Sequence, residues 1–227
     1  APEKLAQEIN EQSKECYGIG EKLFAQRNKA SKELEKQIEK ELKDLAMPDA
    51  KIKVVVEKKL NSPEELMSER GSSGIDDIEF MFLPNPGEPY RPLREIASGG
   101  ELARTMLSVA KVLSDVDDTD VLVFDEIDAN IGGRLGTEIG SKISLLSNRH
   151  QILCVTHLPQ IASFADKQFK ISKVVLKGIT KTSLAELTGQ NRLLELAEMM
   201  QGKNYTDITI KQAEDLLQKG QALRIKS

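Results

Sequence analysis

The sequence contains little cysteine, few aromatic side chains and no long apolar run. Two cysteines among 227 residues are too few for a disulfide framework, and neither lies in a metal-ligand spacing, so we expect a reducing, cytoplasmic setting. No apolar run reaches the length of a membrane span or forms a secretory signal, so we predict no membrane association. At 39% hydrophobic and 30% charged residues, the chain can form one substantial mixed domain with a long polar helix attached.

An excess of basic residues is also missing. The chain has 32 lysines and arginines against 36 acidic residues, a net charge of −4, whereas domains that bind nucleic acid are usually basic. Local lysine clusters exist, and each is open to two interpretations, a phosphate contact or an ordinary solvated face. The clusters are Lys29, Lys32 and Lys36, and Lys51, Lys53, Lys58 and Lys59.

The strongest positive signal is an apolar run, 121–124, that ends in two adjacent carboxylates, Asp125 and Glu126. A short, unalternating run predicts a strand buried on both faces, as in a parallel sheet, with the acids at its carboxyl end, where such sheets bind ligands. Asp125 can then hold Mg²⁺, and Glu126 can orient or deprotonate a water molecule. This pattern is typical of the Walker B element of nucleotide hydrolases. The alternative is a strand that ends in an exposed acidic turn.

A glycine pair opens a predicted helix upstream of that strand. Ser98 is a good N-cap, and Glu101 completes a capping box three residues later. Gly99 and Gly100 leave backbone amides bare at the positive end of the helix dipole, which favours close approach of a phosphate over an ordinary capped helix. The predicted apolar face of this helix is Leu102, Met106, Val109 and Leu113.

A second buried-strand pattern, 151–155, leads to His157, one of only two histidines. A lone histidine is often structural, but this one follows the next strand after the acidic one, so both strand ends should meet at one crevice. We therefore expect His157 to contact phosphate. Between the strands lies a turn-rich loop, 128–133, that begins with Asp128. It leads into a helix with Leu135, Ile139, Ile143 and Leu146 on one face.

The order of these motifs resembles the carboxyl half of an ABC-type ATPase head, with signature motif, Walker B, D-loop and switch histidine. Four specific strings of residues resemble the RecN family, bacterial proteins of DNA double-strand-break repair related to SMC (structural maintenance of chromosomes) proteins. The strings that carry this resemblance are 84–89 (PNPGEP), 97–104 (ASGGELAR), 124–128 (FDEID) and 155–162 (VTHLPQIA).

The resemblance implies that ATP and Mg²⁺ are the ligands and that two heads sandwich two nucleotides. Asp125 would order Mg²⁺ through a water, Glu126 would be the general base and His157 would contact the γ-phosphate. Asp128 would couple the two sites. Ser98, Gly99, Gly100 and Glu101 form the signature segment that would cap the γ-phosphate held by the opposite head. DNA as a partner and a location at the nucleoid are likewise implied only by the family.

No Gly-x-x-x-x-Gly-Lys-Ser/Thr string occurs, so the sequence contains no P-loop. In RecN-like proteins that loop lies near the N-terminus of a much longer polypeptide. The chain also begins with Ala1-Pro2 rather than methionine. We therefore expect it to be the C-terminal part of a split or truncated protein, to need the N-terminal P-loop half as partner, and to be inactive alone.

The first part of the chain, from about Glu3 to Leu45, predicts one long helix. Its apolar residues repeat in alternating steps of four and three, which is the seam of a left-handed coiled coil. The alternative is a solitary amphipathic helix folded back on the head. The seam comprises Leu5, Ile9, Gln12, Cys16, Ile19, Leu23, Gln26 and Ala30, and then, after a stutter, Leu34, Ile38, Leu42 and Leu45.

These elements together predict an α/β fold, the C-terminal half of an ABC/SMC-type head. It should have a parallel sheet core with flanking helices, an antiparallel layer and a long coiled-coil helix. We predict a coiled-coil root over 1–47 and the head lobe over 48–227. Strands are expected at 51–57, 75–82, 167–177 and 179–187, and short helices at 64–67, 193–200 and 207–217.

Two other functions stay open at this stage. A non-catalytic coiled-coil scaffold or clamp that binds a protein partner fits the missing P-loop, but does not explain why Glu126 and His157 lie in full motif contexts. A transporter nucleotide-binding subunit fits less well, because of the long N-terminal helix.

Overall fold

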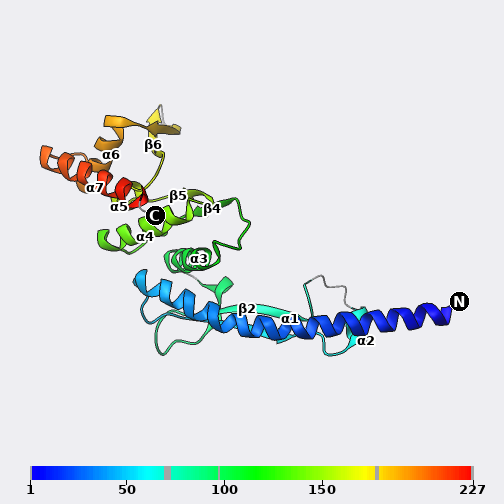
Figure 1. Ribbon diagram of the computed structural model, residues 1–227. Helices are drawn as coiled ribbons and strands as arrows, with labels where there is room; N and C mark the ends of the chain where they lie inside the picture. The colour runs from blue at the N-terminus through cyan, green and yellow to red at the C-terminus, as the bar shows by residue number, and fades with distance from the viewer. Residues whose placement is uncertain (1, 69–72, 97, 177–178, 226–227) are drawn as a thin grey trace. The chain divides into compact units, whose positions relative to one another are not determined.

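The computed structural model describes all residues except 1, 69–72, 97, 177–178 and 226–227. The chain divides into two compact units, residues 1–97 and 98–227. In the first unit, a helix of 43 residues lies along an antiparallel sheet (Figure 1). The elements of this unit are α1 (Pro2–Asp44), β1 (Lys51–Lys58), α2 (Pro63–Ser68), β2 (Asp76–Leu83), β3 (Arg91–Pro92) and a 3₁₀ turn (Leu93–Glu95).

The second unit alternates strands and helices, as expected of an α/β fold, and adds a terminal hairpin and two closing helices. Its elements are α3 (Gly99–Leu113), β4 (Val121–Phe124), α4 (Gly133–Leu146), β5 (Gln151–Cys154), α5 (Pro159–Ala162), β6 (Gln168–Leu176), β7 (Ile179–Leu187), α6 (Gly189–Gln201) and α7 (Asp207–Ile225). The expected strands and helices are therefore confirmed, within a few residues at most ends. The division into domains at residue 47 stays a prediction.

Helix α1 buries only the C-terminal part of its predicted seam. The buried side of the helix includes two small residues, Ser13 and Gly20, and the predicted seam positions Ile38 and Leu42. Leu5, Ile9 and Ile19 of the seam are 47–59% exposed. The seam therefore remains open at its N-terminal end, as far as Ile19, while its last residues join the core of the first unit.

Polar groups of α1 complete the packing against β1. Val54 N donates to Glu35 Oε1 at 2.9 Å, and Ile52 N donates to Glu39 Oε1 at 3.4 Å. These amides lie on the edge of the three-stranded sheet, whose order is β1-β2-β3. Glutamates four residues apart on the helix thus satisfy the outward N–H groups of an edge strand, which would otherwise be free to pair with another chain.

The parallel pair of the second unit is β4 and β5, in the register Val121↔Gln151 to Phe124↔Cys154. The prediction that both strands are buried on both faces is wrong. Phe124 is 5% exposed, but the opposite face of the pair is open among the described residues. The open face comprises Val121, Val123, Leu153 and Val155, which are 43–65% exposed.

The predicted apolar face of α3 is also not the buried one. Met106 is 43% exposed, whereas Thr105, Leu107 and Ser108 are fully buried. The two hydroxyls can be buried because each donates to the carbonyl four residues earlier, at 2.8 Å and 3.0 Å, and so leaves no unsatisfied polar group. By contrast, α4 buries Ile139, Ile143 and Leu146 as expected.

The hairpin and the closing helices complete the second unit. Lys170 on β6 forms ion pairs with Glu195 and Glu198 on α6. A small apolar core joins α5, α6 and α7 through Ala162, Leu196, Ala197 and Ala213. No helix among the described residues is both long enough and apolar enough to cross a membrane.

Candidate functional site

The site lies at the carboxyl ends of β4 and β5. Because the strands are parallel neighbours and Val155 N donates to Phe124 O at 2.9 Å, the residues after both strands emerge at the same edge. Asp125 and Glu126 follow β4, and both are exposed. Glu126 has a φ of 56°, an uncommon conformation for a residue other than glycine, and Asp125 Oδ1 accepts from its amide at 2.9 Å.

His157, after β5, is fixed by a buried carboxylate. Asp128 Oδ2 accepts from the backbone amides of His157 at 2.8 Å and Leu158 at 3.2 Å, and from the Thr156 hydroxyl. The same oxygen lies 3.0 Å from His157 Nδ1, and 70% of the histidine side chain is exposed. A proton on Nδ1 that faces Asp128 leaves Nε2 as the nitrogen available to a further group.

Asp128 therefore acts within the described chain as the anchor of the histidine loop. Its side chain is 5% exposed, and its Oδ2 faces the ring nitrogen and three further donors from the loop. The structure thus brings Asp128 and His157 together, and Ala129 N donates to Glu126 O at 3.0 Å, which joins the loop that carries Asp128 to the acidic pair.

The glycine pair at the start of α3 touches this same loop. Ser98 caps the helix, with its hydroxyl accepting from Glu101 N at 3.5 Å, which is one of the two bonds of the expected capping box. A Cβ at Gly99 would overlap Glu126 Oε2, and one at Gly100 would lie 3.0 Å from Ala129 Cβ. Close approach to the acidic loop is therefore a structural reason for both glycines. Ser98 and Gly99 stay exposed, whereas Gly100 is buried.

One residue of the site was missed by sequence reasoning. Arg104 Nη1 donates to Ala129 O at 3.3 Å, and burial lowers the pKa of its guanidinium. Its Nε is buried and has no hydrogen-bond partner among the described residues. The signal in the sequence is its spacing, since Arg104 lies four residues after Gly100 and so on the same side of α3.

Cys154 ends β5 close to the acidic residues but is not a nucleophile. Burial, with smaller contributions from the charges of Asp128 and Asp125, raises the pKa of its thiol to about 12. A thiol with that pKa stays protonated at neutral pH and is unreactive.

Two glycines of α4 allow the segment that follows His157 to pack closely against this helix. A Cβ at Gly136 would lie 3.2 Å from Gln160 Cβ, and one at Gly140 would overlap the Phe164 ring. Helix α4 therefore packs closely against α5. This packing is a structural reason for the small residues of α4 that face the segment after His157.

The donor set was tested against Mg²⁺ and ATP. No group of three metal-ligating side chains lies close enough to hold an ion within the part of the chain that the structure describes. Asp125 does offer carboxylate oxygen at the strand end, and protein-bound Mg²⁺ commonly takes one or two carboxylates and completes its shell with phosphate oxygens and water. The residues therefore fit one ligand of a magnesium–nucleotide site whose other ligands come from elsewhere.

No protein-family model matches the chain. The DNA repair protein RecN of Streptomyces coelicolor is 35% identical over 215 residues, which are 92% of this chain and 37% of that protein. RecN of Treponema pallidum is 35% identical over 219 residues, 96% of this chain and 38% of that protein. The chain belongs to the RecN family.

This RecN-family chain spans little more than a third of the length of these curated relatives. Among solved structures, the Smc head domain of Pyrococcus yayanosii has a TM-score of 0.49 and 20% identity, over 78% of this chain and 30% of that one. The family assignment rests on the RecN sequences.

Proposed function

We propose that this chain is one lobe of an SMC-like ATPase that acts in recombinational repair of DNA double-strand breaks. It supplies the signature segment (Ser98 to Glu101), the Walker B pair (Asp125 and Glu126), the D-loop Asp128 and the switch His157. The observation that carries the proposal is the anchoring of His157 by Asp128 at the same sheet edge where the acidic pair ends.

Each residue has a task that its surroundings support. The exposed carboxylate of Glu126 orients or deprotonates the attacking water. His157 presents Nε2 to the γ-phosphate, because Nδ1 faces Asp128. Asp125 contributes to a Mg²⁺ site, where the ion, when bound, neutralises charge on the phosphates. Ser98 and Gly99 are exposed at the start of a 15-residue helix and offer amides to the nucleotide of a second head.

The missing wall of the site comes, in this proposal, from the N-terminal P-loop half of the protein. The open apolar face of β4 and β5 supports this, because three strand residues and Val155, which follows β5, are 43–65% exposed and need a cover. ATP would then join two such heads into a homodimer, and hydrolysis would release them.

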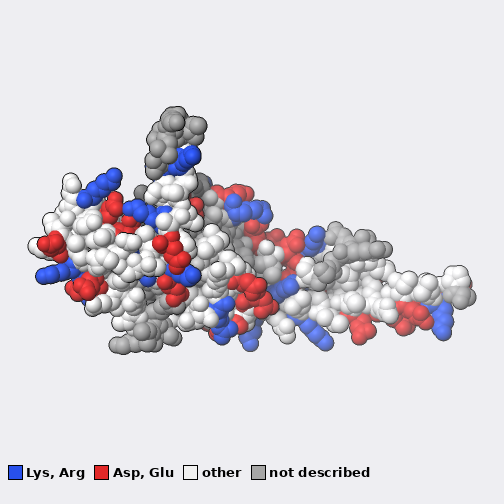
Figure 2. All heavy atoms as spheres, turned by 90° about the horizontal axis from the view of Figure 1, so that it is seen from above, with Lys and Arg blue, Asp and Glu red and all other residues white. Residues whose placement is uncertain are grey.

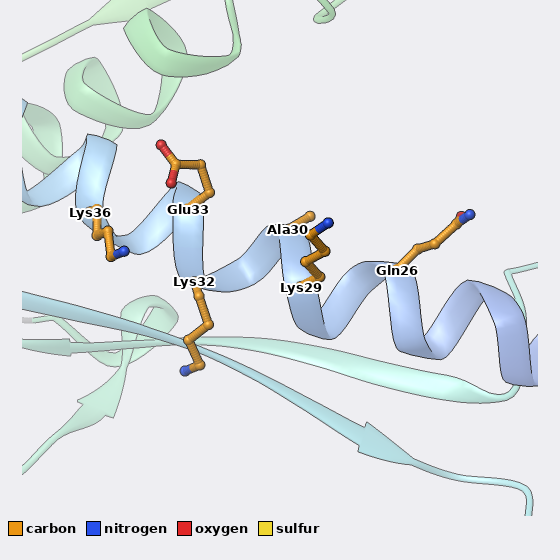
Figure 3. Close-up of a pocket in the computed structure, with 6 residues that line it drawn as sticks. All are labelled: Gln26, Lys29, Ala30, Lys32, Glu33 and Lys36. Atoms are coloured by element: carbon orange, nitrogen blue, oxygen red, sulfur yellow. The ribbon is translucent and has the colours of Figure 1, made fainter.

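The exposed seam of α1 supports a partner helix from the same half. Figure 3 shows Gln26 and Ala30, two seam positions, on one side of α1 and Lys32 on the other, toward the strands. Lys32 pairs with Glu35 at 3.0 Å. A helix whose N-terminal seam residues are exposed is suited to a coiled coil.

DNA enters the proposal through the family and not through the charge. Figure 2 shows basic and acidic side chains interspersed on the face in view. Lys51 and Lys58 are neutralised by Glu39 and Glu21 at 2.9 Å and 2.7 Å. These two lysines are therefore poor candidates for phosphate contacts.

The test uses the complete protein, or this chain combined with its P-loop half. We expect the wild type to hydrolyse ATP and Glu126→Gln to bind ATP normally but to accumulate as a nucleotide-bound dimer, measured by phosphate release and by light scattering. Glu138→Gln, on an exposed position of α4, is the matched control and should behave as wild type. If Glu126→Gln hydrolysed ATP as fast as the wild type, Glu126 would have no role in the hydrolysis step.

A second candidate, a non-catalytic scaffold, is favoured by one observation, the long open seam of α1. Under that reading the assembled protein neither binds nor hydrolyses ATP, although it still forms complexes through α1. The same phosphate-release assay on the wild type therefore separates the two candidates.

A further inference from the structure

The loop after β4 has an uncommon backbone conformation and is held in place by contacts with α3. Glu126 and Asn130, near its two ends, have φ values of 56° and 60°, so the loop holds two residues in an uncommon backbone conformation. Such conformations persist where surrounding contacts determine them. On the side of α3, these contacts come from the glycine pair and from Arg104.

Arg104 is the polar link between α3 and this loop. Its Nη1 donates to Ala129 O at 3.3 Å, and a Cβ on Gly100 would lie 3.2 Å from the same Nη1. The guanidinium therefore touches both the inner end of the glycine turn and the peptide that follows Asp128. The buried Nε–H without a partner among the described residues is unusual, because buried donors are nearly always satisfied.

Because Arg104 leaves its Nε–H without an acceptor among the described residues, its guanidinium can form a second set of hydrogen bonds if its surroundings shift. A change in the glycine turn would move Gly100 against Nη1 and shift the donor that holds Ala129 O. The loop carries Glu126 and Asp128, and Asp128 in turn carries His157. A displacement at the glycine turn can thus reach all three residues through contacts that are already present.

We propose that Arg104 is a positioning residue that couples the phosphate-facing turn of α3 to the 126–130 loop. In the dimer of the proposed function, on which this inference rests, the turn serves one nucleotide and the loop serves the other. Arg104 then makes hydrolysis at one site depend on occupancy of the second. It touches neither nucleotide itself.

A direct structural test needs no nucleotide. Arg104 holds the loop through Ala129 O, and the loop is closed by the bond from Ala129 N to Glu126 O. In the complete protein, Arg104→Gln should therefore loosen the loop and raise hydrogen exchange at the Ala129 amide about tenfold, as expected when a bond from a charged donor no longer opposes loop opening. Arg149→Gln is the control, because Arg149 forms an exposed ion pair with Asp115 in the same unit. Unchanged exchange at Ala129 in Arg104→Gln would show that the contact does not hold the loop.

The functional test is the ATP dependence of hydrolysis. We expect wild type and Arg149→Gln to respond cooperatively to ATP. Arg104→Gln should lose cooperativity and about tenfold in kcat, with the affinity for a fluorescent ATP analogue changed less than about twofold. Arg104→Lys, which retains a donor but not the planar fork, should recover part of both. A lower affinity with cooperativity intact would instead indicate a merely structural role.

The two proposals fail in different ways. A wild type that does not hydrolyse ATP overturns the proposed function and this inference with it. A wild type that hydrolyses ATP without cooperativity, or an Arg104→Gln protein as cooperative as wild type, overturns only the inference.

Discussion

Asp128 Oδ2 lies 3.0 Å from His157 Nδ1, and the two side chains differ sharply in exposure, 5% for the aspartate and 70% for the histidine. The buried partner fixes the exposed one. Because the same oxygen also accepts two backbone amides, the carboxylate determines the path of the chain after β5 as well as the orientation of the ring.

Replacement of Asp128 by Asn should therefore disturb the loop as well as the site. Hydrogen bonds to a charged acceptor contribute about 1.5–3 kcal/mol each, so we expect a loss of about 2 kcal/mol in the free energy of unfolding. Urea unfolding measures this loss, and hydrogen exchange at the amides of His157 and Leu158 locates it. Asp118→Asn, at an exposed position, should be neutral. Unaltered exchange at both amides in Asp128→Asn would contradict the assignment.

The two cysteines should differ in reactivity. Cys16 is exposed, whereas the pKa of Cys154 is raised to about 12 by burial. At pH 8 about one Cys154 thiol in ten thousand is ionised, so alkylation should modify Cys16 first and Cys154 only on unfolding. Mass spectrometry of the alkylated peptides distinguishes the two sites. Rapid labelling of half-buried Cys154 in the folded protein would contradict its raised pKa.

The same pKa predicts a dependence of stability on pH. The thiol ionises near its ordinary value of 9.0 in the unfolded chain but near 12 in the folded one. The free energy of unfolding should therefore be unaffected by this group below about pH 9 and should fall as the pH rises toward 12. Cys154→Ser should flatten this slope, whereas Cys16→Ser should leave it unchanged. Equal slopes in all three proteins would exclude Cys154 as the cause.

Two glycines of α1 provide a matched pair. A Cβ on Gly18 meets nothing within 4 Å, so Gly18→Ala should stabilise the helix by about 1 kcal/mol. A Cβ on Gly20 would lie 2.7 Å from Ile75 Cγ2, in a side chain that is 1% exposed, so Gly20→Ala should destabilise by about 1–3 kcal/mol. Urea unfolding should show opposite signs. Stabilisation by both changes would mean that α1 does not pack on Ile75.

The glutamates along β1 should protect an edge strand. Glu35→Ala removes the acceptor of Val54 N and should lower the free energy of unfolding by about 1–3 kcal/mol. It should also increase aggregation, measured by light scattering, because the strand edge becomes free to pair. Glu33→Ala is the control, because Glu33 accepts an exposed hydrogen bond from Gln37 on the helix surface, and it should change stability by about 0.5 kcal/mol or less.

The motifs and elements were predictable from the sequence because they depend on local chemistry. Apolar runs ending in polar residues located β4 and β5, Ser98 located the start of α3, and four specific residue strings indicated the RecN relationship. Burial was less predictable. The open face of β4 and β5 could not be foreseen, because a short apolar strand has the same composition whether or not a neighbour covers it.

The sequence by itself determined which residues follow the two parallel strands, since strand direction and order are properties of the chain. Tertiary structure decided the contacts: that Gly99 and Gly100 press on the acidic loop, that Arg104 holds Ala129, and that Asp128 holds His157. These pairs are separated by 25–29 residues in the cases of Arg104 and Asp128, and no local pattern specifies a hydrogen bond across such a distance. Only the packing of α3 and β5 around the loop after β4 brings the partners within reach.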